Sequence, residues 1–188
     1  MAVNLFLKLS KSGAPIKGEC QDAVFQGMIQ LRSFQMSSLS LLARGPASGA
    51  PDADAADAAD AGGDACSFTV KKLLDESSAD LFLNYTQAQS PEKRKSCLLR
   101  GTVYVRSDGP PAKGTSADAV SFLALEFSDV FVYDYSLEGN QEDPRPVEEV
   151  KFYFDKYKMT YREPYAADGV SLKPPRCVGW DFEASVAL

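Results

Sequence analysis

Residues 150–161 have the sequence Val-Lys-Phe-Tyr-Phe-Asp-Lys-Tyr-Lys-Met-Thr-Tyr. Their apolar side chains fall on even positions as far as Phe154 and on odd positions from Tyr157 onward. Alternation of this kind is typical of half-buried β-strands, because successive side chains of a strand point to opposite faces. One extra residue near Asp155 explains the switch. Such a bulge lets one strand serve two differently facing surfaces, as in a sheet that curls into a barrel.

Alternation with period two recurs along the rest of the chain. From Leu123 to Leu137 the large apolar residues keep one parity, interrupted at Ser128-Asp129, which predicts a long strand with a bend or bulge. Residues 25–36 are expected to form a single strand. The same alternation predicts further strands at 3–9, 67–71, 98–106 and 178–182.

One segment has helical spacing. Ser77, with Asp80 three positions later, is typical of a helix start, and the apolar residues from Leu81 to Ala88 follow near the spacing of one helix face. Pro91 is expected to end this helix. A length of 188 residues suits one domain. Many strands with a single helix predict a mainly β fold, either a closed barrel or a sandwich.

Residues 45–65 form a low-complexity acidic segment that contains no large apolar side chain and no Lys or Arg. Such a segment has nothing to offset the entropy cost of ordering it, so a solvated loop is predicted. A short exposed helix is the alternative, although like charges on one face would weaken it. The segment lacks the closing glutamate of an EF-hand, and no metal site is expected. Its aspartates are Asp52, Asp54, Asp57, Asp60 and Asp64.

The charge distribution restricts the classes of partner. The net charge is −6, and the acidic segment accounts for most of it. Without a basic stripe, neither nucleic acid nor an anionic membrane surface is an expected partner. No apolar run approaches the ~18 residues that cross a bilayer, so no membrane insertion is expected. The first nine residues alternate and contain Lys8, which predicts a strand and export, if any, without a classical signal peptide.

The residue types argue against an enzyme. The chain contains no histidine, so the usual general base, the Ser–His and Cys–His pairs and the commonest zinc ligand are missing. The sequence also has no glycine-rich phosphate loop and no nucleophile elbow. Glu142-Asp143 and Glu148-Glu149 are expected in a solvated loop and not as a catalytic carboxylate pair. No cofactor is expected.

Four cysteines lie far apart in the sequence, at Cys20, Cys66, Cys97 and Cys177. Their spacing contains no CxxC motif, which indicates reduced thiols. Two disulfides stay open as an alternative for an extracellular protein.

Four stretches, taken in order, carry a family resemblance. They are Leu5–Leu9 with Ile16-Lys17-Gly18-Glu19, then Ile29–Phe34, then Phe68–Lys72 with the helix that follows, and finally Glu148–Tyr161 with Gly179-Trp180-Asp181. Their order and spacing resemble the Hcp tube proteins of bacterial type VI secretion systems. The last stretch is the most specific, and Cys20 departs from the family, which commonly has a small polar residue there.

This resemblance implies a two-sheet antiparallel β-barrel with one flanking α-helix that associates into hexameric rings. The rings would stack into the inner tube of a contractile injection machine and carry or export effectors. The implied partners are further copies of the chain and the sheath, baseplate, spike and effector proteins. Assembly would take place in the bacterial cytoplasm, followed by release outside the cell. In this family the loop after the second strand projects toward a neighbouring ring, and the acidic segment occupies that position here.

Candidate subunit or ring-stacking contacts are spread along the chain. For Arg32 and Phe34, a position in a strand with a buried Phe and an exposed Arg explains the residues as well as a subunit contact does. Asp129, at the bend, could contact a partner subunit or could accept hydrogen bonds from backbone amides of its own chain. Trp180, the only tryptophan, is expected in the core. The full set is Arg32, Phe34, Asp52, Asp54, Asp57, Asp60, Asp129, Tyr153 and Tyr157.

The alternative function is a monomeric β-barrel module that binds a small apolar ligand or a protein. It predicts a monomer with a cavity inside the barrel or at its mouth.

Overall fold

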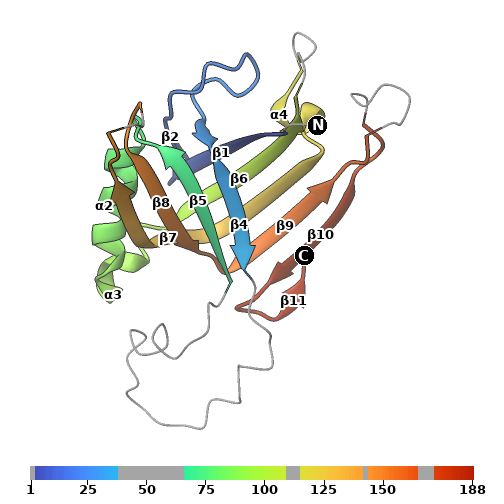
Figure 1. The fold of residues 1–188 in the computed structure, drawn as a ribbon. Coiled ribbons are helices and arrows are strands. Elements are labelled where there is room, and N and C mark those ends of the chain that lie inside the picture. The colour runs from blue at the N-terminus through green and yellow to red at the C-terminus, as the bar shows by residue number, and fades with distance from the viewer. Residues whose placement is uncertain (1–2, 38–65, 109–114, 142–143, 165–171) are drawn as a thin grey trace.

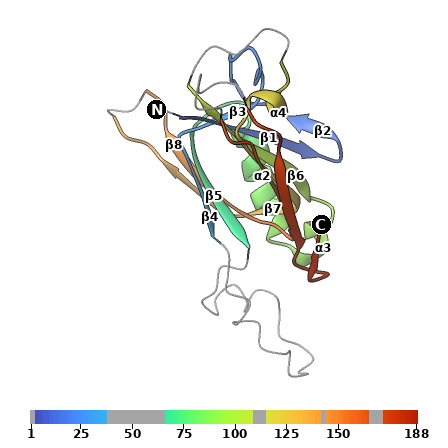
Figure 2. The ribbon, with the colours of Figure 1, turned by 90° about the vertical axis from the view of Figure 1, so that its right-hand side faces the viewer.

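The computed structural model describes residues 3–37, 66–108, 115–141, 144–164 and 172–188. Two antiparallel sheets face each other, with helices at the periphery (Figures 1 and 2). Sheet A contains β1 (Val3–Lys11), β2 (Ala14–Ile16), β3 (Ile29–Leu31), β6 (Leu99–Ser107), β7 (Leu123–Glu138), β9 (Lys156–Tyr161), β10 (Arg176–Asp181) and β11 (Val186–Ala187). Sheet B contains β4 (Ser33–Ser37), β5 (Ser67–Leu73) and β8 (Val147–Tyr153), and it shares β7.

The two sheets are joined along two sides, which gives the predicted two-sheet barrel. The long strand β7 pairs with β6 and β9 in sheet A and with β8 in sheet B. On the other side the chain runs from β3, paired with β1, into β4, paired with β5. Arg32 lies at this junction, and its backbone N–H donates to the Lys71 carbonyl oxygen at 2.7 Å.

The parity switch predicted near Asp155 marks the point where the chain leaves sheet B for sheet A. β8 ends at Tyr153 and β9 begins at Lys156, and both pair with β7. The Asp155 N–H donates to the Ser128 carbonyl oxygen at 3.3 Å, which holds the crossing against β7. The predicted change of faces near Asp155 is therefore confirmed, but it occurs at a break between two strands and not at a bulge within one strand.

β7 contains two irregularities, so the prediction of a single parity from Leu123 to Leu137 is wrong. The first is the expected bulge at Ser128-Asp129, where two residues oppose Arg100 and Asp129 has a φ of 57°. The second lies between Val132 and Asp134. Each bulge reverses the faces, so Val130 and Val132 enter the core while Phe131 and Tyr133 point away from it.

Residues 25–28 form a turn, and the predicted single strand over 25–36 is therefore two short strands that begin at Ile29. The buried Phe25 ring stacks on Phe6 with centroids 4.0 Å apart. This stacking pair packs against Tyr104 and Ala124 on the outer side of sheet A as a second small core. Phe25 is therefore apolar because it packs in this second core, and not because it belongs to a strand.

The main core fills the space between the sheets. It consists of inward side chains from both sheets, such as Leu7, Val103 and Leu125 from sheet A and Phe68 and Phe152 from sheet B. The Phe68 ring stacks between Phe127 and Phe152, at centroid distances of 4.3 Å and 4.6 Å.

The predicted helix is α2 (Ser78–Ala88), which lies against β7 at one side of the barrel (Figure 1). Leu81 enters the main core, and the buried Asn84 amide bridges the Val132 N–H and the Cys97 carbonyl oxygen at 2.9 Å and 2.6 Å. The Ser77 hydroxyl donates to Asp75 at 2.5 Å and makes no capping bond to the helix. Two short helices, α3 (Pro91–Arg94) and α4 (Ala117–Val120), flank the sheets.

Candidate assembly surfaces

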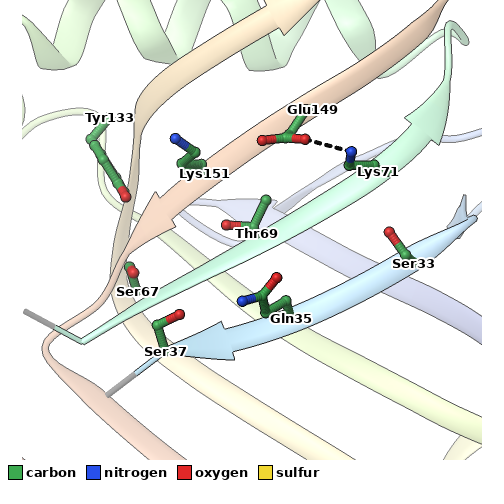
Figure 3. Close-up of a pocket in the computed structure, with 9 residues that line it drawn as sticks. All are labelled: Ser33, Gln35, Ser37, Ser67, Thr69, Lys71, Tyr133, Glu149 and Lys151. Atoms are coloured by element: carbon green, nitrogen blue, oxygen red, sulfur yellow. Dashed lines mark ion pairs between the residues drawn. The ribbon is translucent and has the colours of Figure 1, made fainter. Parts of the chain in front are cut away.

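The outer face of sheet B carries a polar region that crosses β4, β5 and β8 (Figure 3). A shallow open depression of about 290 Å³ lies on it, lined by Ser33, Gln35, Ser37, Ser67, Thr69, Lys71, Tyr133, Glu149 and Lys151. These residues alternate with the apolar side chains that face the core, such as Val70 and Val150. Each strand of sheet B thus has one apolar and one hydrophilic face.

The charges on this polar face are paired. Lys71 Nζ lies 2.8 Å from Glu149 Oε2, and Lys151 Nζ lies 2.8 Å from Asp134 Oδ2. The Glu149 carboxylate accepts a hydrogen bond from Lys71 and raises the pKa of that ammonium. The face therefore presents hydroxyl, amide and ion-paired groups, and it is neither apolar nor dominated by one sign of charge.

Beneath the same sheet, Lys72 and Glu148 form a buried ion pair, which corrects the expectation that Glu148 lies in a solvated loop. Both side chains are fully buried, with Lys72 Nζ 2.6 Å from Glu148 Oε2. Lys72 also lies 2.8 Å from Asp75 and donates to the Ser78 hydroxyl at 3.0 Å. The buried charges are tolerated here because every member of the cluster has a hydrogen-bond or ion-pair partner.

The cluster ties α2 to both central strands of sheet B. The Tyr135 hydroxyl donates to Glu148 from β7, and burial followed by this bond raises the pKa of the phenol well above its ordinary value. Lys72 and Glu148 belong to two of the stretches that carry the family resemblance, far apart in the sequence. Their pairing could not be inferred from either stretch alone, because it depends on the β5–β8 register.

Asp129 and the closing Gly179-Trp180-Asp181 stretch meet at the crossing between the sheets. Lys156 Nζ lies 3.6 Å from Asp129 and 3.2 Å from Asp181. The Asp181 carboxylate accepts the Ala184 N–H at 2.9 Å, and this bond together with Lys156 lowers the pKa of Asp181. Asp129 thus bonds a lysine of its own chain.

The remaining candidate contacts have different environments. Arg32 is exposed, whereas Phe34 and Tyr157 are partly buried and pack against the main core. Tyr153 faces outward and stacks on Phe131 with centroids 5.2 Å apart. Their role as subunit contacts stays a prediction. Asp52, Asp54, Asp57 and Asp60 lie outside the described residues, as do Glu142 and Asp143.

The exposed apolar side chains could not be predicted from the sequence, because a strand or helix pattern does not show which apolar residue stays uncovered in the folded protein. Phe82 and Leu83 on α2 are each 51% exposed, and Leu137 at the end of β7 is 52% exposed. On the opposite side of the barrel, Val178 is 59% and Tyr161 is 43% exposed. Trp180 is half-buried and belongs to neither described core cluster, so its expected core position is not what the structure shows.

Other features of the described residues bear on cofactors and location. Within them, no three Cys, Asp or Glu side chains gather closely enough to bind a metal ion. Their helices include none that is both long and apolar enough to cross a bilayer. All four cysteines are free thiols; three are buried, and Cys177 is exposed.

Comparison with protein families matches residues 6–161 to the family described as "Type VI secretion system effector, Hcp". The chain belongs to the Hcp family. This match includes sheet B, α2, the buried Lys72–Glu148 pair and most of sheet A, but not β10 and β11. It confirms the function predicted from the sequence, a structural subunit of the type VI secretion tube.

Solved structures of Hcp proteins share the fold. Hcp1 from Salmonella typhimurium is 17% identical, with 100% of both chains covered and a TM-score of 0.67. A structure described as a type six secretion system protein is 18% identical over 100% of both chains, with a TM-score of 0.69. The secreted protein Hcp3 from Pseudomonas aeruginosa is 12% identical, over 96% of this chain and 99% of that chain, with a TM-score of 0.55. No curated protein sequence matches significantly.

Proposed function

We propose that this Hcp subunit forms hexameric rings that stack into a tube, and that the polar outer face of sheet B lines the lumen. The observation that carries the proposal is the composition of that face. Every residue that lines its depression has a polar group, although the opposite face of the same strands is apolar. A wall that conveys folded or partly folded cargo must not retain it through large apolar contacts.

The paired charges support the same role. A lumen with one dominant sign of charge would repel some cargo and hold other cargo tightly. On sheet B, Lys71 and Lys151 are each neutralised by a neighbouring carboxylate. The wall is then hydrated and nearly neutral, and effectors of varied charge can pass it.

The outer face of sheet A is the natural exterior of such a ring. It carries exposed charges on neighbouring strands, including Lys8, Arg100 and the Glu126–Lys158 pair at 3.6 Å. This surface would face the sheath, while the ends of the barrel would face neighbouring rings, the baseplate and the spike. We further propose that assembly takes place in the bacterial cytoplasm and that the subunits are expelled with the tube.

We propose a role between rings for the acidic segment. Ser37 and Ser67, which precede and follow the segment, pair with each other at one end of sheet B. The chain therefore leaves sheet B at Ser37 and re-enters it at Ser67, at the same end of the sheet. We propose that Asp52, Asp54, Asp57 and Asp60 contact the next ring.

Light scattering after size exclusion, with negative-stain images of the peak, tests the ring. The expected result is about six times the subunit mass of 20.4 kDa and particles with a central hole. A monomer at every concentration, and with added sheath and baseplate proteins, would refute the ring and favour the binding-module alternative.

The orientation of the sheets has its own test. Thr69→Cys and Lys158→Cys, each in a Cys177→Ser background, place one thiol on sheet B and one on sheet A. In stacked tubes a bulky polyethylene-glycol maleimide should modify the Lys158→Cys protein and spare the Thr69→Cys protein, while both react after disassembly. The reverse pattern would place sheet A toward the lumen.

A further inference from the structure

An exposed apolar patch, here called the helix patch, lies where α2 covers β7. Its exposed members are Phe82, Leu83 and Leu137, supported by the half-buried rings of Tyr85 and Tyr135. The Phe82 and Tyr135 centroids are 5.4 Å apart, so the aromatic side chains form one continuous surface. Leu137 follows Tyr135 on the same face of β7.

A second exposed apolar patch, here called the wing patch, lies on β9 and β10. Val178 of β10 pairs with Met159 of β9, and Trp180 pairs with Tyr157. The side chains of Met159 and Tyr157 pack against the main core. The core-facing side of sheet A therefore continues onto β10, where Val178 becomes 59% exposed. Tyr161, 43% exposed, extends the patch along β9.

The two patches lie on opposite sides of the barrel. Figure 1 shows α2 at the left edge and β10 at the right edge. In Figure 2, turned by 90°, β10 lies in front and α2 behind. The patches of one molecule therefore cannot cover each other, but those of two copies can.

The start of α2 and the stretch of β10 beside Tyr161 carry charges of opposite sign. Glu76 and Asp80, both exposed, lie at the start of α2, and Asp80 neighbours Leu83 at the i,i+3 spacing. α2 has no basic residue in its last turn. The exposed Arg176 pairs with Tyr161 across β9 and β10, and no ion pair of Arg176 is found among the described residues. Two helix patches, or two wing patches, would bring like charges together.

We infer that a second copy of this chain covers these patches in head-to-tail fashion, with the helix patch of one subunit on the wing patch of the next and Asp80 facing Arg176. This inference rests on the proposed ring and names its lateral contact. A head-to-tail contact uses two different surfaces and closes into a ring when its rotation allows, whereas a contact of one patch with itself ends at a dimer.

Two single variants and their mixture test the pairing. Phe82→Glu removes the helix patch and Val178→Glu removes the wing patch, while each variant keeps the other patch. Each is expected to lose the ring and elute as a folded monomer, with an unchanged circular dichroism spectrum. Their equimolar mixture should form a dimer of twice the subunit mass, because one intact pair of patches remains. Val186→Glu is the matched control, since Val186 is 50% exposed but lies on the other face of the same wing.

A charge exchange tests the predicted ionic contact without removing apolar surface. Asp80→Arg or Arg176→Glu alone should lower the ring fraction at high dilution, and the double variant should restore it. If the wild type forms rings and both Phe82→Glu and Val178→Glu also form intact rings, the inference is overturned and the proposed function is not affected. Dimers formed by only one single variant would overturn it in favour of a self-pairing patch. A wild-type protein that never forms rings would instead refute the proposed function.

Discussion

At the scale of single residues, two neighbouring lysines of β5 face two neighbouring glutamates of β8 in opposite environments. The Lys72–Glu148 pair is 2.6 Å long and fully buried. The Lys71–Glu149 pair is 2.8 Å long, with side chains 53% and 32% exposed. Removal of one partner of a buried pair leaves an uncompensated charge in the interior, whereas exposed pairs contribute little. The chain thus contains its own control for the effect of burial.

Lys72→Met should lower the free energy of unfolding by about 3–5 kcal/mol, because Glu148 and Asp75 lose their shared cation in the core. Lys71→Met should lower it by less than about 1 kcal/mol. Urea unfolding at neutral pH measures both. If both variants lose the same free energy of unfolding, the buried ion pair contributes no more to stability than the exposed one.

Asp22 should contribute to the decrease in the free energy of unfolding at acidic pH. Burial acts to raise the pKa of this carboxyl, but the Val24 N–H and the Arg106 guanidinium, 2.8 Å away, outweigh it and lower the pKa. A folded-state pKa below the unfolded value of about 3.9 stabilises the protein above that pH, and the stabilisation is lost as the pH falls through the folded-state pKa.

Asp22→Asn should therefore reduce stability at neutral pH and flatten the decline of the unfolding free energy below about pH 4. Urea titrations at a series of pH values measure the slope. Glu19→Gln, which breaks the exposed pair with Arg145, serves as the control. Parallel pH curves for the wild type and Asp22→Asn would contradict the prediction.

At the scale of elements, β7 holds the barrel together because it belongs to both sheets. Two bulges let it do so, since each one turns the strand and exchanges its faces. At the first bulge Asp129 has a φ of 57°, a backbone conformation that asparagine, aspartate and glycine adopt most readily.

Asp129→Gly should keep the fold, with a small loss from the Lys156 contact. Asp129→Val should be less stable than Asp129→Gly by about 1–3 kcal/mol, because a β-branched residue is strained at positive φ. Thermal unfolding of the two variants gives the difference. Equal stability would mean that the bulge relaxes to an extended conformation in the valine variant.

At the scale of the whole molecule, the barrel separates its surfaces by chemistry. Sheet B presents a polar face, sheet A a charged face, and the two sides carry the helix patch and the wing patch. Under the proposed assembly, folding, ring closure and stacking use different parts of the chain, and variants can test each of them separately.

Replacement of residues 45–64 by a short turn removes five of the carboxylates that give the chain its charge of −6. Stability and ring mass should not fall, because a shorter loop costs slightly less to close. Stacking should change, and the salt dependence of tube length should weaken, because fewer exposed charges remain to be screened. Sedimentation over a range of salt concentrations measures this. Unchanged tubes would show that the segment takes no part in stacking.

Much of the architecture was predictable from local pattern. Most of the strands, α2, the bulge at Asp129 and the crossing near Asp155 follow from side-chain periodicity, because each depends on residues close in sequence. The order of the family stretches predicted the Hcp fold for the same reason. The acidic segment was recognisable from composition, although its position lies outside the described residues.

Burial and partnership were decided only by the tertiary structure. Glu148 lies in the core because the β5–β8 register places it against Lys72. The second bulge of β7, between Val132 and Asp134, was not predicted, and it returns Tyr135 to the side of the core. The helix patch and the wing patch consist of ordinary core-type residues that no other part of the described chain covers. The sequence by itself determined which elements form, since periodicity is a local property, whereas exposure is a property of the assembled barrel and was settled by contacts between residues distant along the chain.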